Sequence, residues 1–186
     1  VNGLVGSEMC IRDRLAGAAA PDADPETLDA AVARGERAAA VLRRLGYRWA
    51  LGATLGELGR LHRSRGEYDQ AEACYRESVD LFGEMKYHGL HYIFSELGHL
   101  ASLQGKHDAA RRHHERGLQL ALDDGNPACH ALALMACARS ELLAAEPADA
   151  AQLVRRARTL HPEVDLLIEG DELDEQLFEL ARRSAD

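Results

Sequence analysis

Aromatic residues are scarce in this chain: five Tyr, three Phe and one Trp make up 5% of its 186 residues. They are spread along the sequence, so no segment has the aromatic concentration that lines a small-molecule cavity. No apolar run approaches the ~20 residues that a membrane-spanning helix needs. We therefore expect neither an aromatic ligand chamber nor an association with membranes.

Catalytic signatures are missing as well: there is no phosphate-binding glycine loop, no Gly-x-Ser-x-Gly elbow and no His-Glu-x-x-His pair. Nine histidines raise the question of a metal site, since His88 and His91 are one helical turn apart and His107 and His114 two turns apart. Zinc needs three or four converging ligands, and neither pair has an evident third. We predict no enzyme activity, no metal and no cofactor, and we interpret these histidines as solvated, with His114 a partly buried packing residue.

Cysteine is also rare, with four in the chain. Cys74, Cys129 and Cys137 lie inside helical patterns and lack the C-x-x-C spacing of redox or zinc motifs. Disulfides are uncommon in reducing compartments, and isolated cysteines of this kind are typical of buried, reduced side chains. The sequence therefore predicts a cytoplasmic protein.

The net charge is −9 and is unevenly placed. Residues 162–186 hold nine acids against Arg182 and Arg183, a balance of −7. Residues 1–14 sum to zero, which leaves −2 for residues 15–161. Binding to nucleic acid needs clustered Lys and Arg that neutralise phosphates, so we expect no nucleic-acid partner.

A repeated two-helix pattern occupies the middle of the chain. Apolar and small residues recur at helical intervals on both sides of Arg65-Gly66-Glu67, and the same pattern returns twice further along the sequence. Small side chains are needed where two helix axes approach closely, so the pattern predicts tight helix crossings. The positions that define the repeat are Leu58, Gly59, Ala71 and Ser78, then Leu97, Gly98, Ala110 and Gly117, and then Ala138, Ala150 and Ala157.

This pattern resembles the tetratricopeptide repeat family over about residues 47–160. The resemblance implies an all-α fold, with tandem antiparallel helix hairpins stacked as a right-handed solenoid. The repeats exceed the family's usual length of about 34 residues. In addition, His62, Ala101 and Glu141 stand where its first helix carries an aromatic residue. Repeats of this greater length are similar to those at the C-terminus of bacterial signal-transduction ATPases and transcription regulators.

The repeat also sets the expected domain boundaries. Residues 1–14 fit no repeat position and resemble translated sequencing-adapter read-through, so we interpret them as a non-native leader; a disordered native tail is the alternative. Residues 15–46 are expected to be a linker and the orphan second helix of an upstream repeat, 47–161 three repeats, and 162–186 an acidic segment with a capping helix. The helices are expected at about 26–45, 48–65, 67–84, 88–104, 106–124, 127–145, 147–160 and 172–184.

A binding face follows from the family resemblance. First helices line the concave side in this family, and the position after the small residue points into the groove; here it holds Arg60, His99 and Arg139. An acidic peptide would suit this column, because Arg binds carboxylates bidentately. In the alternative, Glu57 and Glu96, three residues earlier, form pairs that only solvate a helix face. The predicted groove residues are Arg60, Arg63, Tyr92, His99, Met135 and Arg139.

We therefore predict a protein-interaction scaffold that is a fragment of a larger bacterial signalling or transcription-regulatory protein and binds a protein or peptide. Its orphan helix leaves an N-terminal edge through which it could self-associate. The alternative, implied by the signal-transduction ATPase resemblance, is a domain in which a small-molecule effector changes the curvature of the repeats. For the acidic tail, the apolar stripe of Leu173, Leu177 and Leu180 favours a cap on the last repeat over competition for the groove, because burying it would contribute several kcal/mol.

Overall fold

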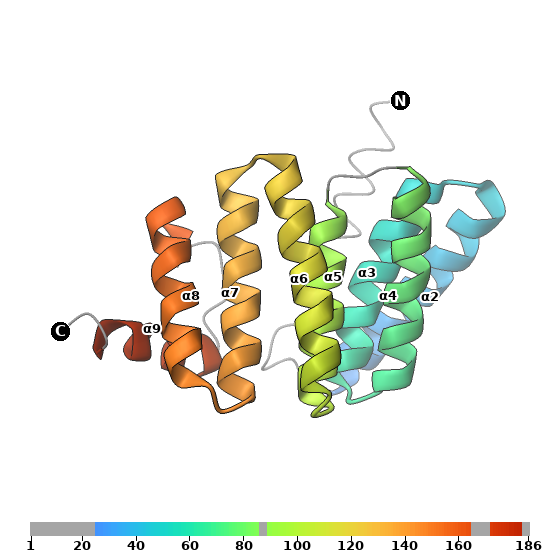
Figure 1. The fold of residues 1–186 in the computed structure, drawn as a ribbon. Helices are drawn as coiled ribbons and strands as arrows, with labels where there is room; N and C mark the ends of the chain where they lie inside the picture. The colour runs from blue at the N-terminus through green and yellow to red at the C-terminus, as the bar shows by residue number, and fades with distance from the viewer. Residues whose placement is uncertain (1–24, 86–88, 165–171, 184–186) are drawn as a thin grey trace. The chain divides into compact units, whose positions relative to one another are not determined.

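The computed structural model describes residues 25–85, 89–164 and 172–183, and these ranges contain eight α-helices and no strand (Figure 1). Each helix lies within two residues of its predicted bounds, which confirms the all-α class and its tandem hairpins. Residues 1–14 and the linker up to residue 24 lie outside the described residues. The helices are α2 (Pro25–Leu45), α3 (Arg48–Ser64), α4 (Tyr68–Glu84), α5 (Leu90–Leu103), α6 (His107–Asp124), α7 (Pro127–Leu143), α8 (Pro147–Leu160) and α9 (Glu172–Arg183).

The boundary between α6 and α7 shows how the sequence sets these ends. Gly125 follows α6 in the left-handed conformation, with φ of +70°. Glycine adopts this conformation at little steric cost, so the helix can end there. The Asn126 side chain then accepts a hydrogen bond of 3.0 Å from the backbone N–H of Ala128, and Pro127 takes the first helical position. Both residues are favoured at these positions, so α7 begins where the sequence predicts.

The chain divides into two compact units, residues 1–87 and 88–186, and each is described by itself. In the first unit, α3 packs against both α2 and α4. Apolar residues spaced at helical intervals on α2 and α3 face each other and form a single core. Its buried members are Leu28, Ala31, Val32, Ala39, Leu51, Leu55, Leu58 and Leu61.

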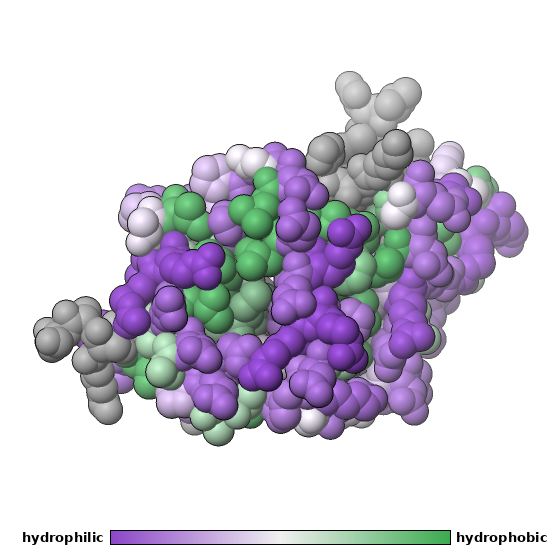
Figure 2. Space-filling view, in the orientation of Figure 1, coloured by the Kyte–Doolittle hydropathy of each residue, from purple (hydrophilic) through white to green (hydrophobic). Residues whose placement is uncertain are grey.

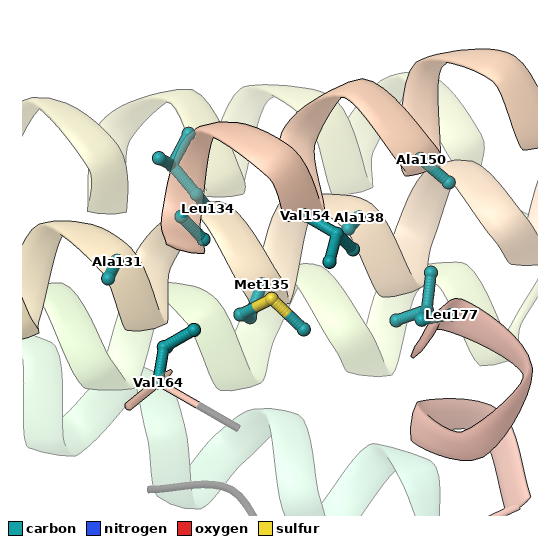
Figure 3. Packing of buried hydrophobic residues seen from close by; sticks show 9 residues of the cluster. Ala131, Leu134, Met135, Ala138, Ala150, Val154, Val164 and Leu177 are labelled. Atoms are coloured by element: carbon teal, nitrogen blue, oxygen red, sulfur yellow. The ribbon is translucent and has the colours of Figure 1, made fainter. Parts of the chain in front are cut away.

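In the second unit, α5 pairs with α6 and α7 pairs with α8, while α7 also packs against both α5 and α6. Helix α9 contacts α7 and α8, so it packs on the hairpin α7–α8 as α7 packs on the hairpin α5–α6. Figure 2 shows hydrophobic residues among the mostly hydrophilic residues on the surface of this unit. The buried cluster, shown in Figure 3, contains Ala131, Leu134, Met135, Ala138, Ala150, Val154, Ala157, Val164 and Leu177.

The apolar side of α9 packs against this cluster. Leu177 is fully buried, and Phe178 and Leu180 pack around it, whereas Leu173 is half-buried. The Arg158 guanidinium of α8 lies 5.2 Å from the centroid of the Phe178 ring, in cation–π range. Helix α9 is therefore held on the last hairpin through apolar contacts.

The turn inside each hairpin has the same backbone geometry. Gly66 and Gly105 are left-handed, with φ of +73° and +71°, and Ala145 takes the equivalent place with φ of +61°. The next residue's N–H donates back to a carbonyl five residues earlier: Glu67 to His62, Lys106 to Ala101 and Glu146 to Glu141, at 2.9, 2.9 and 2.8 Å. Glycine adopts this conformation freely, whereas alanine is strained in it. The third hairpin thus keeps the shape of the predicted glycine break, though not its residue.

The tight crossings predicted for small residues are present in both units. A Cβ atom added at Gly117 would lie 3.0 Å from the backbone oxygen of His91, so α6 and α5 touch at that point. At the equivalent crossing of α4 and α3, the buried Ser78 hydroxyl donates to the Gly52 carbonyl at 2.8 Å. The cost of a glycine inside a helix is therefore offset here by close packing.

Candidate functional site

The predicted groove begins on α3 with Arg60. Its Nη1 lies 3.2 Å from the Glu57 carboxylate, and the two side chains are only 13% and 12% exposed. The structure therefore contains the ion pair between Glu57 and Arg60 that the alternative predicts, although neither side chain is fully solvated. Arg63, one turn further along α3, is also half-buried.

The second unit carries the other predicted groove residues on α5 and α7, which pack against each other. His99 and Arg139 are half-buried at equivalent positions of the two helices, and Tyr92 is 39% exposed near the start of α5. Since Arg60 and Arg63 belong to the first unit, a column running through all three hairpins remains a prediction.

Met135 does not belong with these residues. It is 1% exposed and packs in the cluster that contains Val164 and Leu177 (Figure 3). The helical period placed Met135 on the first-helix face correctly, but the chain that follows α8 covers it. A ligand cannot reach this side chain while α9 is in place, so Met135 is withdrawn from the groove.

A buried polar network in the second unit was not predicted. His114 Nε2 on α6 lies 2.7 Å from the Ser140 hydroxyl on α7, which is hydrogen-bonded to the Ser102 hydroxyl on α5. Ser102 in turn donates to the Gly98 carbonyl at 3.1 Å. All three side chains are at most 5% exposed, so His114 is fully rather than partly buried, and the network joins three helices.

Burial governs the chemistry of His114. Loss of solvent, with the charge of His113 as a smaller cause, lowers the pKa of His114 from 6.5 to about 4. Its Nδ1 is buried and has no hydrogen-bond partner among the described residues. A Ser-His pair can act as nucleophile and base, but Ser140 and His114 are closed to a substrate and no third group orients the ring within the described chain. The pair is structural.

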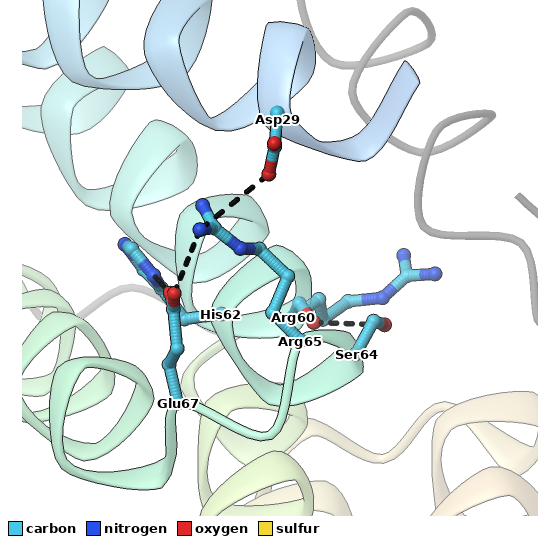
Figure 4. Close-up of polar contacts among 6 residues, drawn as sticks. All are labelled: Asp29, Arg60, His62, Ser64, Arg65 and Glu67. Atoms are coloured by element: carbon cyan, nitrogen blue, oxygen red, sulfur yellow. Dashed lines mark hydrogen bonds and ion pairs between the residues drawn. The ribbon is translucent and has the colours of Figure 1, made fainter. Parts of the chain in front are cut away.

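The first unit has a polar network at the turn between α3 and α4, drawn in Figure 4. The Glu67 carboxylate lies 2.6 Å from His62 Nδ1 and 2.8 Å from Arg65 Nη2. Arg65 also reaches Asp29 on α2, at 3.4 Å. This network connects the three helices of the unit at one end. His62, which stands where the family's first helix carries an aromatic residue, is buried.

Burial determines the chemistry of the described cysteines. Cys74, Cys129 and Cys137 are free and half-buried. Burial raises the pKa of the Cys74 thiol to about 11 and that of Cys137 to about 12, so neither is a thiolate at neutral pH.

Among the described residues, which exclude His88, no group of three or more His, Cys, Asp and Glu could hold a metal ion. No described helix is long and apolar enough to cross a membrane.

Comparison with known proteins agrees with the hairpin geometry. The sequence model of the tetratricopeptide repeat matches residues 54–81 and 93–128. No curated protein sequence matches the chain significantly. The crystal structure of BtubC (BKLC) from P. vanneervenii superposes with a TM-score of 0.63 at 18% sequence identity, over 78% of this chain and 61% of that one. The chain thus spans less than two thirds of that protein, and the likeness concerns the fold.

The family match falls on the hairpins α3–α4 and α5–α6, including the turns at Gly66 and Gly105. The crossings Gly52 with Ser78 and His91 with Gly117 lie at equivalent positions of these two hairpins. Sequence match and repeated geometry agree: residues 54–81 and 93–128 form two tetratricopeptide repeats.

Proposed function

We propose that this chain is a protein-interaction scaffold that binds an acidic peptide segment through Arg60, Arg63, His99 and Arg139. That repeats of this family serve as scaffolds for protein–protein interaction follows from the family match. The acidic partner is supported by one observation: the position after the small residue holds Arg, His and Arg in three successive hairpins, and each side chain is half-buried rather than fully solvated. Partly buried cations bind carboxylates more strongly than fully exposed ones.

The pair between Glu57 and Arg60 bears on this proposal, because an acidic ligand must compete with Glu57 for the guanidinium. The resulting contact at Arg60 replaces an existing one, so its net contribution is small. Tyr92, which is 39% exposed, would contact apolar groups of the same peptide.

We also propose that the chain acts in the cytoplasm as the regulatory part of a larger bacterial signalling or transcription-control protein. The repeat spacing supports this, since it exceeds the common tetratricopeptide spacing of about 34 residues and is similar to the long repeats of such proteins. The free thiols support a reducing compartment. Effector sensing within the repeats is the competing proposal, and no described contact favours it.

Fluorescence anisotropy with a labelled peptide of alternating Glu and Leu tests the acidic partner, with the matching Lys-Leu peptide as control. We expect binding that weakens as salt rises, falls roughly tenfold in Arg139→Ala, as loss of one charge-assisted contact implies, and falls further in the double variant Arg60→Ala/Arg139→Ala. Circular dichroism would verify that both variants stay folded. Equal binding of the two peptides, or binding unchanged in the double variant, would exclude this partner class.

A further inference from the structure

The C-terminal end of α2 and the first turn of α3 expose an unusual group of side chains. Val41, Leu45, Tyr47 and Trp49 are 43%, 55%, 44% and 41% exposed. They account for four of the nine exposed large hydrophobic residues in the described part of the chain, within a stretch of nine residues. Solvated apolar groups are common singly, but a contiguous group marks an interaction surface.

The same surface is basic. On a helix with 3.6 residues per turn, Arg34, Arg37 and Arg44 fall on one stripe with Val41 and Leu45, opposite the residues that α2 buries against α3. Residues 34–49 contain five Arg and one Glu, a balance of +4 in a chain of −9. We call this stripe, with Tyr47 and Trp49, the basic face.

The arginines of this stretch fall into two groups. Arg43 of α2 forms an ion pair with Glu77 of α4 at 2.7 Å, and Arg48 of α3 forms one with Glu84 of α4. Within the described residues, Arg34, Arg37 and Arg44 take part in no ion pair, and all three are exposed. The basic face therefore combines unneutralised Arg with Tyr and Trp, the residue types enriched at protein interfaces.

A complementary surface lies at the other end of the sequence. Helix α9 has four acids and no base in its first eight residues, and residues 162–186 as a whole sum to −7. Because α9 packs Leu177 into the second unit, its opposite side is turned outward, with Glu175 and Gln176 exposed. Charge on the two surfaces is opposite, and both lie on helices that the packing of their own units holds in place.

We propose that the basic face of one copy of this chain binds the acidic side of α9 on a second copy. The two surfaces are different, so the contact is heterologous, and a dimer formed by one such contact keeps one free basic face and one free acidic side. Association should therefore continue past a dimer as concentration rises. It should also weaken with salt, because screening shortens the Debye length from ~10 Å at 0.1 M to ~3 Å at 1 M.

Sedimentation velocity of the whole chain tests this proposal, from low micromolar to several hundred micromolar protein in low salt and in high salt. The expected result is a sedimentation coefficient that rises with concentration in low salt only. Trp49 is the single tryptophan of the chain and lies in the basic face, so its emission should shift to the blue in the same samples. A coefficient independent of concentration in low salt would overturn the proposal.

Charge reversal gives the matched controls. We expect Arg34→Glu/Arg37→Glu/Arg44→Glu and Glu172→Lys/Glu175→Lys each to weaken association about tenfold, as the loss of two or three exposed ion pairs implies. An equimolar mixture of the two variants should recover it, because the first variant keeps the acidic side of α9 and the second keeps the basic face, and the two reversed surfaces are also complementary. Recovery also shows that both variants are folded.

Three other outcomes would count against the proposal. If the mixture does not recover although both variants keep the parent's circular dichroism, the two surfaces do not meet. A blue shift of Trp49 that is independent of concentration would assign the contact to the same molecule. Binding to phosphatidylserine vesicles without self-association would assign the basic face to an anionic membrane. The acidic-peptide proposal uses none of these residues, so either can fail alone.

Discussion

The ring of His114 fills the space in which a side chain at Gly98 would begin: a Cβ atom there would lie 2.5 Å from both Cε1 and Nε2 of the ring. The same relationship joins Gly59 to Tyr75, whose ring would lie within 2.6 Å at Cδ1. Gly98 and His114 are the repeat equivalents of Gly59 and Tyr75 in the next hairpin. A small residue on the first helix and a ring on the second thus form one packing unit in each of these hairpins.

Substituting Gly98 with leucine should destabilise the second unit. Leucine gains about 1 kcal/mol in helix propensity over glycine, but overpacking against His114 should cost about 1–3 kcal/mol. Urea denaturation would measure the difference. Gly83→Leu is the matched control, because Gly83 lies on α4 with no atom within 4 Å of its added Cβ and should become more stable. A Gly98→Leu variant more stable than the parent would contradict the packing described here.

Acid should destabilise the chain through His114. Its folded pKa of about 4 lies below the unfolded 6.5, so between these values the unfolded state binds more protons and stability falls as pH falls. The contribution is fully present above pH 6.5, and about 3 kcal/mol is lost by pH 4. His113 opposes protonation of the ring, and Glu141 and Glu96 favour it.

His114→Gln tests this titration, since glutamine can still bond to Ser140 but does not titrate. The measurement is the free energy of unfolding at several pH values from 4 to 7, in parent and variant. The variant should show a shallower loss toward pH 4. If the free energies of unfolding of parent and variant change in parallel with pH, His114 has the same pKa in the folded and unfolded states.

The third hairpin turn can be relaxed by one substitution. Ala145 is left-handed at φ of +61°, a conformation that costs an L-residue about 1–2 kcal/mol. Glycine removes this strain but adds about 0.4–1 kcal/mol of unfolded-state entropy, so Ala145→Gly should stabilise by roughly 0.5–1 kcal/mol. Thermal unfolding would report it. Ala144→Gly, where φ is −81°, should instead lower the midpoint, and two shifts of the same sign would argue against the strain.

Removing the apolar anchor of α9 should loosen the end of the second unit. Leu177 is fully buried in the cluster with Val154 and Met135, and Leu→Ala at such sites costs about 2–5 kcal/mol. Hydrogen exchange in α8 and α9 would locate the effect, and exposed Gln176→Ala serves as the control. Unchanged stability in Leu177→Ala would show that α9 contributes nothing to the core.

The helices were predictable because their signals are local. Proline at positions 127 and 147, the left-handed turns and the 3.6-residue apolar period each depend on neighbouring residues only, and helix bounds agree within two residues. The close approach at Gly98 and Gly117 was predictable as well, because glycine inside a helix needs a packing reason.

The rest depended on contacts between distant residues. Met135 was misplaced because a helical period gives a face but not what covers it, and Val164 and Leu177 both come from the chain that follows α8. The network of His114, Ser140 and Ser102 was missed since serine in a helix has no pattern that distinguishes a buried hydrogen bond from a solvated side chain. Polar residues at positions whose repeat equivalents are apolar or aromatic are the available signal, and His114 in the place of Tyr75 is one.

Within the described chain, the helices of the second unit pack only on the next helix in sequence or the one after it. Contacts between near neighbours are closed quickly, so a chain of this topology should refold on the microsecond to millisecond scale, faster than a sheet protein of equal size. Folding can begin at either hairpin and spread to the other. Evolution can likewise lengthen such an array by duplicating one hairpin, since a new copy must fit only the surfaces on its two sides.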